Sequence, residues 1–143
     1  MLEACGDEEC GHVFVYNAAF EKTRIKEAAE RFRPIRKLLL ALNDRIVDLL
    51  PVAQKFFYCP SQQGSWSIKR VLPAVVPELR YDQLEGVQNG GAAMAAYLGA
   101  IDPATTPKRK AEIEAQLRAY CKLDTYAMVR LFQVFSGRPS VQL

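Results

Sequence analysis

Residues 12–32, HVFVYNAAFEKTRIKEAAERF, decide the fold class, because a short apolar run passes there directly into a helical pattern. The run at 12–16 is rich in residues that favour β-structure and predicts a buried strand. Asn17 is a favoured residue at a helix N-terminus, and the pattern from Ala18 to Phe32 is helical until Arg33-Pro34 ends it. A strand followed at once by a helix is typical of an α/β layer fold.

The remainder of the chain adds one more strand and several helices. Arg45-Ile-Val-Asp-Leu-Leu50 predicts a second strand, closed by Pro51. The predicted helices cover 35–43, a segment that starts at 65 and stops near Pro73 or Pro77, 92–101 and 108–135. We therefore expect the α/β class, predominantly helical, with two short strands and about five helices. They would form a single domain over 1–143, with loose ends at 1–11 and 136–143.

Composition and charge set the limits of function. Half of the 143 residues are hydrophobic and 24% are charged, which is typical of a globular chain with a core and excludes disorder. The longest apolar run, Leu38 to Leu42, is far too short to span a bilayer. The first ten residues are acidic, unlike a signal peptide, so we expect a cytoplasmic protein without membrane contact. A net charge of +3 permits a nucleic-acid partner without requiring one.

The four cysteines are expected to be free thiols, as is usual in a cytoplasmic chain. Cys5, Cys10 and His12 form C-x4-C-x-H, which has the form of half a zinc site. A structural zinc needs four ligands, and Cys59 and Cys121 are single and distant in sequence. This ligand count disfavours zinc.

Two carboxylates fall on predicted apolar helix faces. In helix 108–135 the apolar residues are spaced by three and four, and Asp124 occupies one position of their stripe. That stripe is otherwise formed by Ile113, Leu117, Tyr120, Met128, Leu131 and Phe135. An unpaired buried carboxylate is costly, so Asp124 is either paired with an internal arginine, or a cap of another helix, or a metal ligand.

Glu21 repeats this pattern in the first predicted helix. It lies on the stripe marked by Ala18, Ile25, Ala28 and Phe32, one turn after the strand. Its carboxylate either interacts with the helix N-terminus or serves a site at the strand's carboxyl end. Two such carboxylates on separate faces suggest a shared cation.

Tyr120 lies four residues before Asp124, on the same face and about 6 Å away by helix geometry. A phenol beside a metal-bound carboxylate can orient a nucleophilic water, although a tyrosine at such a position is more often part of the core. The two residues form the pattern Y-x3-D.

These motifs resemble the DEDD superfamily of 3′→5′ exonucleases, which have a ribonuclease H-like fold. Tyr16-Asn-Ala-Ala-Phe-Glu21 resembles the second motif of that superfamily, and Tyr120-Cys-Lys-Leu-Asp124 resembles the tyrosine version of the third. The run from residue 12 to 135 resembles still more closely an uncharacterised bacterial domain at the C-terminal end of predicted RecB-like or Cas4-like nucleases. The resemblance implies a partial ribonuclease H-like exonuclease fold.

The chain departs from the superfamily at two points. The second motif ends in Glu21 where aspartate is usual, and the first motif, D-x-E on an upstream strand, is absent. Asp7-Glu8-Glu9 matches D-x-E as letters, but it lies only a few residues before the predicted strand. We therefore expect a nuclease-family domain that is weakly active or inactive as this chain alone.

The resemblance also implies a cofactor, a substrate and site residues. Two Mg²⁺ or Mn²⁺ ions would be held by four carboxylates, here including Glu21 and Asp124, with Tyr120 orienting the nucleophile. The substrate would be the 3′ end of single-stranded DNA or RNA. Its contacts would come from Asn17, Phe20, Trp66, Lys69 and Arg70, although Trp66 is more often a core residue and Lys69 and Arg70 are the kind of cations usually solvated.

Two other interpretations remain open at this point. The chain is either a non-catalytic binding or oligomerisation remnant of that family, or an unrelated helical scaffold. A half fold would leave a strand edge and the apolar faces of helices 18–32 and 108–135 without their usual cover. This argument predicts a homodimer or higher oligomer.

Overall fold

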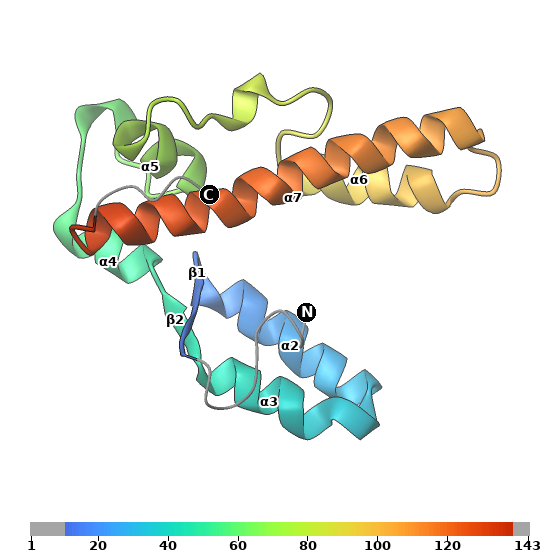
Figure 1. Cartoon of the computed structure of the whole chain (residues 1–143), viewed down its shortest axis with the longest axis horizontal. Helices are drawn as coiled ribbons and strands as arrows, with labels where there is room; N and C mark the ends of the chain where they lie inside the picture. The colour runs from blue at the N-terminus through green and yellow to red at the C-terminus, as the bar shows by residue number, and fades with distance from the viewer. Residues whose placement is uncertain (1–10, 139–143) are drawn as a thin grey trace. The chain divides into compact units, whose positions relative to one another are not determined.

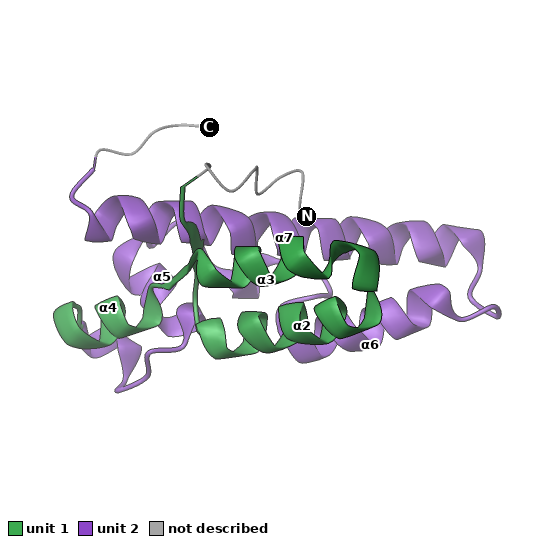
Figure 2. Cartoon of the chain, turned by 90° about the horizontal axis from the view of Figure 1, so that it is seen from below, with its two compact units in different colours: residues 1–58 green, residues 59–143 purple. Residues whose placement is uncertain are grey.

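The computed structural model describes residues 11–138, which are mostly helical and contain two short parallel strands and six α-helices (Figure 1). This confirms the predicted α/β class. The chain divides into two compact units, Met1–Tyr58 and Cys59–Leu143, coloured separately in Figure 2. We call them unit 1 and unit 2 and describe each by itself. That the two together form a single domain stays a prediction, as does the ribonuclease H-like fold.

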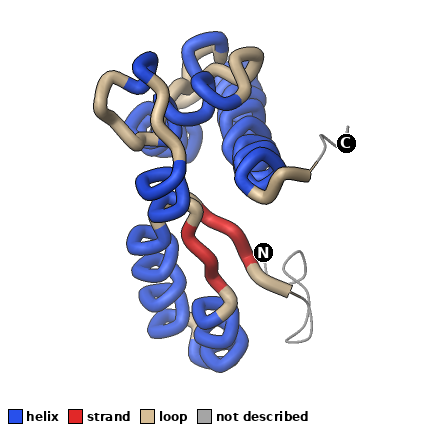
Figure 3. The backbone as a smooth tube through the Cα atoms, turned by 90° about the vertical axis from the view of Figure 1, so that its left-hand side faces the viewer, coloured by secondary structure: helices blue, strands red, loops and turns tan. Residues whose placement is uncertain are grey.

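Unit 1 is built on a pair of parallel strands. Strand β1 (Val13–Val15) pairs with β2 (Ile46–Asp48), and both strands are red in Figure 3. Val13 lies opposite Ile46, and Val15 lies opposite Asp48. A parallel pair needs a long connection, and here it consists of two helices. They are α2 (Ala18–Arg31) and α3 (Arg36–Asp44), separated by a 3₁₀ turn. The expected pairing of strand 12–16 with strand 45–50 is confirmed.

The core of unit 1 lies where the strands meet these helices. Five residues are buried in it, and Val13 and Val15 of β1 pack against them. The five are Ile25, Ala29, Leu39, Leu42 and Ile46. The side-chain amide of Asn43 donates to the Lys22 carbonyl at 3.2 Å and ties α3 to α2. The faces of helix 18–32 are therefore covered in part by α3, and the expectation of a bare apolar face here is wrong.

Helix α4 (Leu50–Phe56) follows β2 directly and was not predicted. We expected Pro51 to close the strand, but it lies in the first turn of α4. A proline fits there, because its missing N–H would have no partner within the helix in any case.

Unit 2 contains three α-helices. These are α5 (Ile68–Val75), α6 (Gly90–Ile101) and α7 (Pro107–Phe135). The sequence predicted that this helix ends near either Pro73 or Pro77. Helix α5 contains Pro73 and ends at Val75, shortly before Pro77, so the later end is confirmed. Figures 1 and 2 both show α6 beside α7, which form a helical hairpin. Thr106 caps α7 by accepting a hydrogen bond from the Arg109 N–H at 3.3 Å.

The predicted apolar stripe of α7 is largely confirmed. Ile113 and Leu131 are buried, and the other members of the stripe, Asp124 included, are half-buried. Helices α5 and α6 pack on α7, so this helix also has its own cover. The buried residues of the unit include Val71, Leu72 and Tyr81.

Candidate functional site

The start of α2 carries three of the predicted site residues. Asn17 is the N-cap residue, as expected, but its backbone is left-handed, with φ of 70°, and its side chain makes no capping hydrogen bond. Asp48 at the end of β2 takes that role. Its carboxylate accepts from the Asn17 N–H at 2.9 Å, the Ala18 N–H at 2.8 Å and the Leu50 N–H at 2.9 Å. One acid thereby closes the N-terminal ends of both α2 and α4.

Phe20 and Glu21 project from this end of α2 into solvent. The phenyl ring of Phe20 is 60% exposed, and the guanidinium carbon of Arg24 lies 5.6 Å from its centroid. Glu21 is exposed, so its expected place on a buried stripe is wrong, as is that of Phe32, which is 51% exposed. The other predicted members of the stripe are confirmed, since Ile25 is buried in the core and Ala18 and Ala28 pack against it. Ala29, which was not predicted, is buried there as well.

In unit 2, Asp124 lies in a cluster of phenols. The Tyr81 hydroxyl donates to Asp124 Oδ1 at 2.5 Å, and the rings of Tyr81 and Tyr120 are 5.9 Å apart at an interplanar angle of 54°. The partner of Asp124 is therefore a tyrosine, whereas the sequence pointed to an arginine, a helix N-terminus or a metal. The pair joins the turn at 81–83 to the middle of α7.

Burial and the nearby carboxylate keep both phenols protonated. Burial is the larger cause that raises the pKa of Tyr120 to about 12, and the charge of Asp124 adds to it. Burial likewise raises the pKa of Tyr81 well above its usual value, with the hydrogen bond to Asp124 as the second cause. At neutral pH these phenols are protonated and can donate a hydrogen bond to an acceptor such as a water or a phosphate oxygen.

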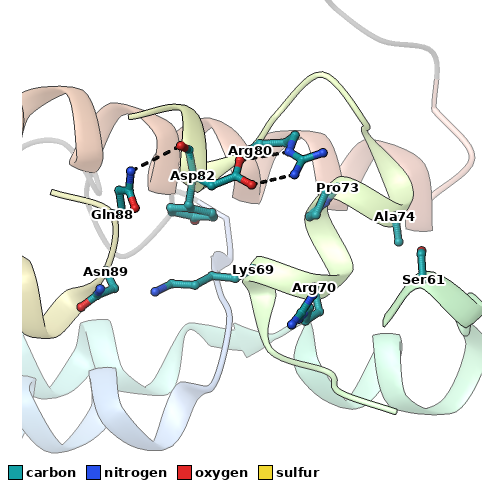
Figure 4. A pocket seen from close by; sticks show the side chains of 10 residues that line it. Ser61, Lys69, Arg70, Pro73, Ala74, Arg80, Asp82, Gln88 and Asn89 are labelled. Carbon is teal, nitrogen blue, oxygen red and sulfur yellow. Dashed lines mark hydrogen bonds and ion pairs between the residues drawn. The ribbon is translucent and has the colours of Figure 1, made fainter. Parts of the chain in front are cut away.

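Beside this cluster, unit 2 contains a pocket of about 530 Å³ (Figure 4). Residues of the 3₁₀ turn at 60–62, of α5 and of the segment between α5 and α6 line the pocket. They are Ser61, Lys69, Arg70, Pro73, Ala74, Arg80, Tyr81, Asp82, Gln88 and Asn89. Lys69 and Arg70, both predicted to contact nucleic acid, lie in its wall. Trp66 is half-buried and is not among the lining residues.

The charges of the pocket are unequal in number. Arg80 is paired with Asp82 through bonds of 3.0 and 2.6 Å, which also hold the pKa of Asp82 below its usual range. Lys69 extends toward Asn89, and its ammonium lies 6.0 Å from the centroid of the Tyr81 ring (Figure 4). Because one acid faces three bases, the wall has an excess of positive charge, supplied by Lys69 and Arg70. Such a wall attracts anions.

The described residues do not by themselves fit the implied metal site. Within 11–138, no three histidine, cysteine, aspartate or glutamate side chains gather closely enough to hold an ion. Mg²⁺ prefers six oxygen ligands, and one oxygen of Asp124 already accepts from Tyr81. Glu21 belongs to unit 1 and Asp124 to unit 2, so a site shared by the two stays a prediction. Cys5 and Cys10 of the disfavoured C-x4-C-x-H zinc pattern lie outside the described residues, as does the run Asp7-Glu8-Glu9.

Two important residues were missed from the sequence. Tyr81 stands in a turn-rich stretch and meets Asp124 across 43 positions, which no local pattern indicates. Asp48 was taken as an ordinary strand residue. The one available signal was its position at the end of a predicted strand, where polar residues of α/β folds often serve a site.

Comparison with known proteins finds a family model for part of the chain. The family model for a domain of unknown function (DUF2779) matches residues 1–67, which include Asn17, Phe20, Glu21 and Trp66 but not Tyr120 or Asp124. No curated protein matches the chain. No solved structure matches it either. Between residues 11 and 138, none of the helices combines the length and the apolar character needed to cross a membrane.

Proposed function

We propose that this chain binds the 3′ end of a single-stranded nucleic acid as part of a metal-dependent 3′→5′ exonuclease. The observation that carries the proposal is the cationic pocket of unit 2, with Lys69 and Arg70 in its wall. Phosphate neutralisation by lysine and arginine is the main source of affinity for nucleic acids. A pocket of about 530 Å³ has room for a nucleotide unit.

Further support comes from the aromatic and phenolic groups in each unit. In unit 1, the exposed ring of Phe20 with Arg24 beside it is a surface on which a base can stack. In unit 2, the Tyr81 hydroxyl is held in place by Asp124. Stacking is tolerant of sequence, so we expect weak base preference.

The resemblance to the exonuclease motifs supplies the proposed reaction, which is hydrolysis of the terminal phosphodiester with Mg²⁺ or Mn²⁺ bound. If the complete protein holds these ions, Glu21 and Asp124 would be two of their carboxylate ligands, and Tyr120 would orient the nucleophile, as the resemblance implies. Since two of the usual four carboxylates have no counterpart among the described residues, we assign to this chain the binding of the strand and assign full catalysis to the complete protein.

The test is binding of a fluorescein-labelled oligonucleotide to the full chain, followed by anisotropy over a range of salt concentrations. In the double variant Lys69→Gln/Arg70→Gln we expect weaker binding and a salt dependence reduced by about 1.4 in slope, about 0.7 for each lost phosphate contact on a single strand. The matched control is Lys108→Gln/Lys110→Gln, which removes the same charge at the start of α7, outside the pocket.

The two double variants distinguish binding of the strand in the pocket from non-specific electrostatic attraction to the chain. If the pocket binds the strand, only the first double variant loses affinity and slope. Equal losses in both would mean that net charge alone attracts the nucleic acid, and an absence of binding at low salt would contradict the proposal itself.

A further inference from the structure

Helix α6 presents its large apolar side chains to solvent. Met94, Tyr97, Leu98 and Ile101 are 64, 54, 56 and 56% exposed. Positions that are three, four and seven apart fall on one side of a helix, so these residues form one continuous surface. We call the four residues the α6 stripe.

The other side of α6 is made of small residues and packs on α7. Ala93, Ala96 and Gly99 are half-buried there, and a Cβ at Gly99 would lie 3.8 Å from Ile113 Cδ1. The hairpin is fastened at its turn by the Thr105 hydroxyl, which donates to the Gly99 carbonyl at 2.7 Å. A surface helix usually turns its large apolar side chains toward its own core. Here the large side chains face away from the partner helix.

The composition of α6 makes this exposure more unusual. None of its residues from Gly90 to Ile101 is charged. A helix that is apolar on all sides is normally buried, and soluble monomers rarely expose an apolar patch of more than a few hundred Å². The α6 stripe therefore has the character of a surface that is covered in the working state of the protein.

We propose that a second copy of this chain covers the α6 stripe, with the two α6 helices packed antiparallel about a two-fold axis. The spacing of the stripe is symmetric about its midpoint between Tyr97 and Leu98. In an antiparallel pair, Met94 therefore lies opposite Ile101 of the other copy, and Tyr97 opposite Leu98. A two-fold interface requires such reciprocity, since the same patch serves both subunits.

The chemistry of the stripe favours a second copy over other occupants. Nucleic acid and anionic lipid surfaces are bound by lysine and arginine, and helices that lie on membranes carry these residues on their polar face. Helix α6 has neither. Its own copy is equally uncharged, so the contact buries no unpaired ion.

The size of the stripe sets the expected strength of the dimer. Four side chains, each more than half exposed, offer on the order of 400 Å² per copy, or about 800 Å² in all. This is below the standard size of a stable interface, so we expect a reversible dimer that dissociates on dilution. The inference does not depend on the proposed function, because none of its residues lies in the cationic pocket.

The experiment is sedimentation velocity of the full chain from about 2 to about 200 µM, the range in which a small interface associates. We expect the wild type to pass from monomer to dimer within it. Leu98 lies immediately beside the axis, so the two copies of this residue are also near each other. Leu98→Glu and Leu98→Lys therefore each bring two like charges together, and each variant alone is expected to stay monomeric. A one-to-one mixture of the two is expected to recover the dimer, because opposite charges then meet.

The matched control is Val134→Glu, which adds the same charge at an exposed apolar residue of α7 in the same unit, and it should associate like the wild type. Thermal unfolding followed by circular dichroism checks that every variant is folded. A wild type that stays monomeric throughout, single variants that still dimerise, or a mixture that fails to recover the dimer would each overturn the proposal.

Discussion

The phenol of Tyr81 is 4% exposed and gives a half-buried carboxylate its partner, so removing its hydroxyl tests how much unit 2 depends on this bond. We predict that Tyr81→Phe lowers the free energy of unfolding by about 2 kcal/mol, since a hydrogen bond to a charged group contributes roughly 1.5–3 kcal/mol. Urea unfolding of the full chain measures the change. Tyr97→Phe, at a tyrosine that is 54% exposed, is the matched control and should change stability little.

The raised pKa values of the tyrosines predict alkaline sensitivity. Burial is the first cause that raises the pKa of Tyr16 and of Tyr120 to about 12, whereas an unfolded tyrosine loses its proton near pH 10. Between these values the unfolded chain binds fewer protons than the folded one, so stability should fall as pH rises from about 10 to 12.

Urea unfolding at several pH values, together with tyrosinate absorbance, checks this prediction. Replacing Tyr120 by phenylalanine should flatten the decline and remove one late-titrating phenol. A free energy of unfolding that falls just as steeply in this variant would show that Tyr120 contributes nothing to the effect.

At the scale of elements, Asp48 joins the end of β2 to the beginnings of α2 and α4 through its three hydrogen bonds. We predict that Asp48→Ala lowers the free energy of unfolding by roughly 2–3 kcal/mol. Each of the two lost helix caps contributes about 1 kcal/mol, and loss of the third hydrogen bond accounts for the rest. Asp48→Asn keeps one acceptor oxygen and should lose less. Asp44→Ala, at an exposed acid of the same unit, is the control, and a loss equal to that of Asp48→Ala would contradict the prediction.

The elements that were predicted correctly are those that a local pattern specifies. The run at 12–16 and the periodicity of 18–32 and 108–135 gave β1, α2 and α7 with small errors at their ends. Helix α4 was missed because proline both ends strands and begins helices, and the sequence around Pro51 does not separate the two roles.

The candidate site was only partly predictable for a related reason. Lys69 and Arg70 were chosen as exposed cations, and they do line the pocket. The third cation, Arg80, and the tyrosine beside it stand in a stretch without periodicity, and their roles arise from contacts with segments distant in sequence. The exposure of Glu21 was mispredicted because an error of one position turns a residue about 100° around a helix, from a buried face to solvent.

For the whole molecule, the division of the predicted ligands between the two units bears on activity. Glu21 is in unit 1 and Asp124 in unit 2, and the described residues hold no cluster of three ligands. We predict little or no Mg²⁺-dependent hydrolysis of a labelled single strand by this chain alone, because each oxygen ligand lost weakens the site. Gel analysis of the products measures it. Robust digestion that disappears in Asp124→Ala would contradict the prediction.

The bonds of Asp48 also have a kinetic consequence. They connect residues 31 and 30 positions apart, so the chain must close a long loop before they can form. Helices α2 and α3 are local structures and can form earlier, which places the bonds of Asp48 late on the folding path. Loss of this carboxylate should therefore accelerate unfolding while leaving the refolding rate nearly unchanged, a difference that stopped-flow measurements on Asp48→Ala would resolve. In unit 1 this acid would thus determine how long the folded state lasts more than how quickly it is reached.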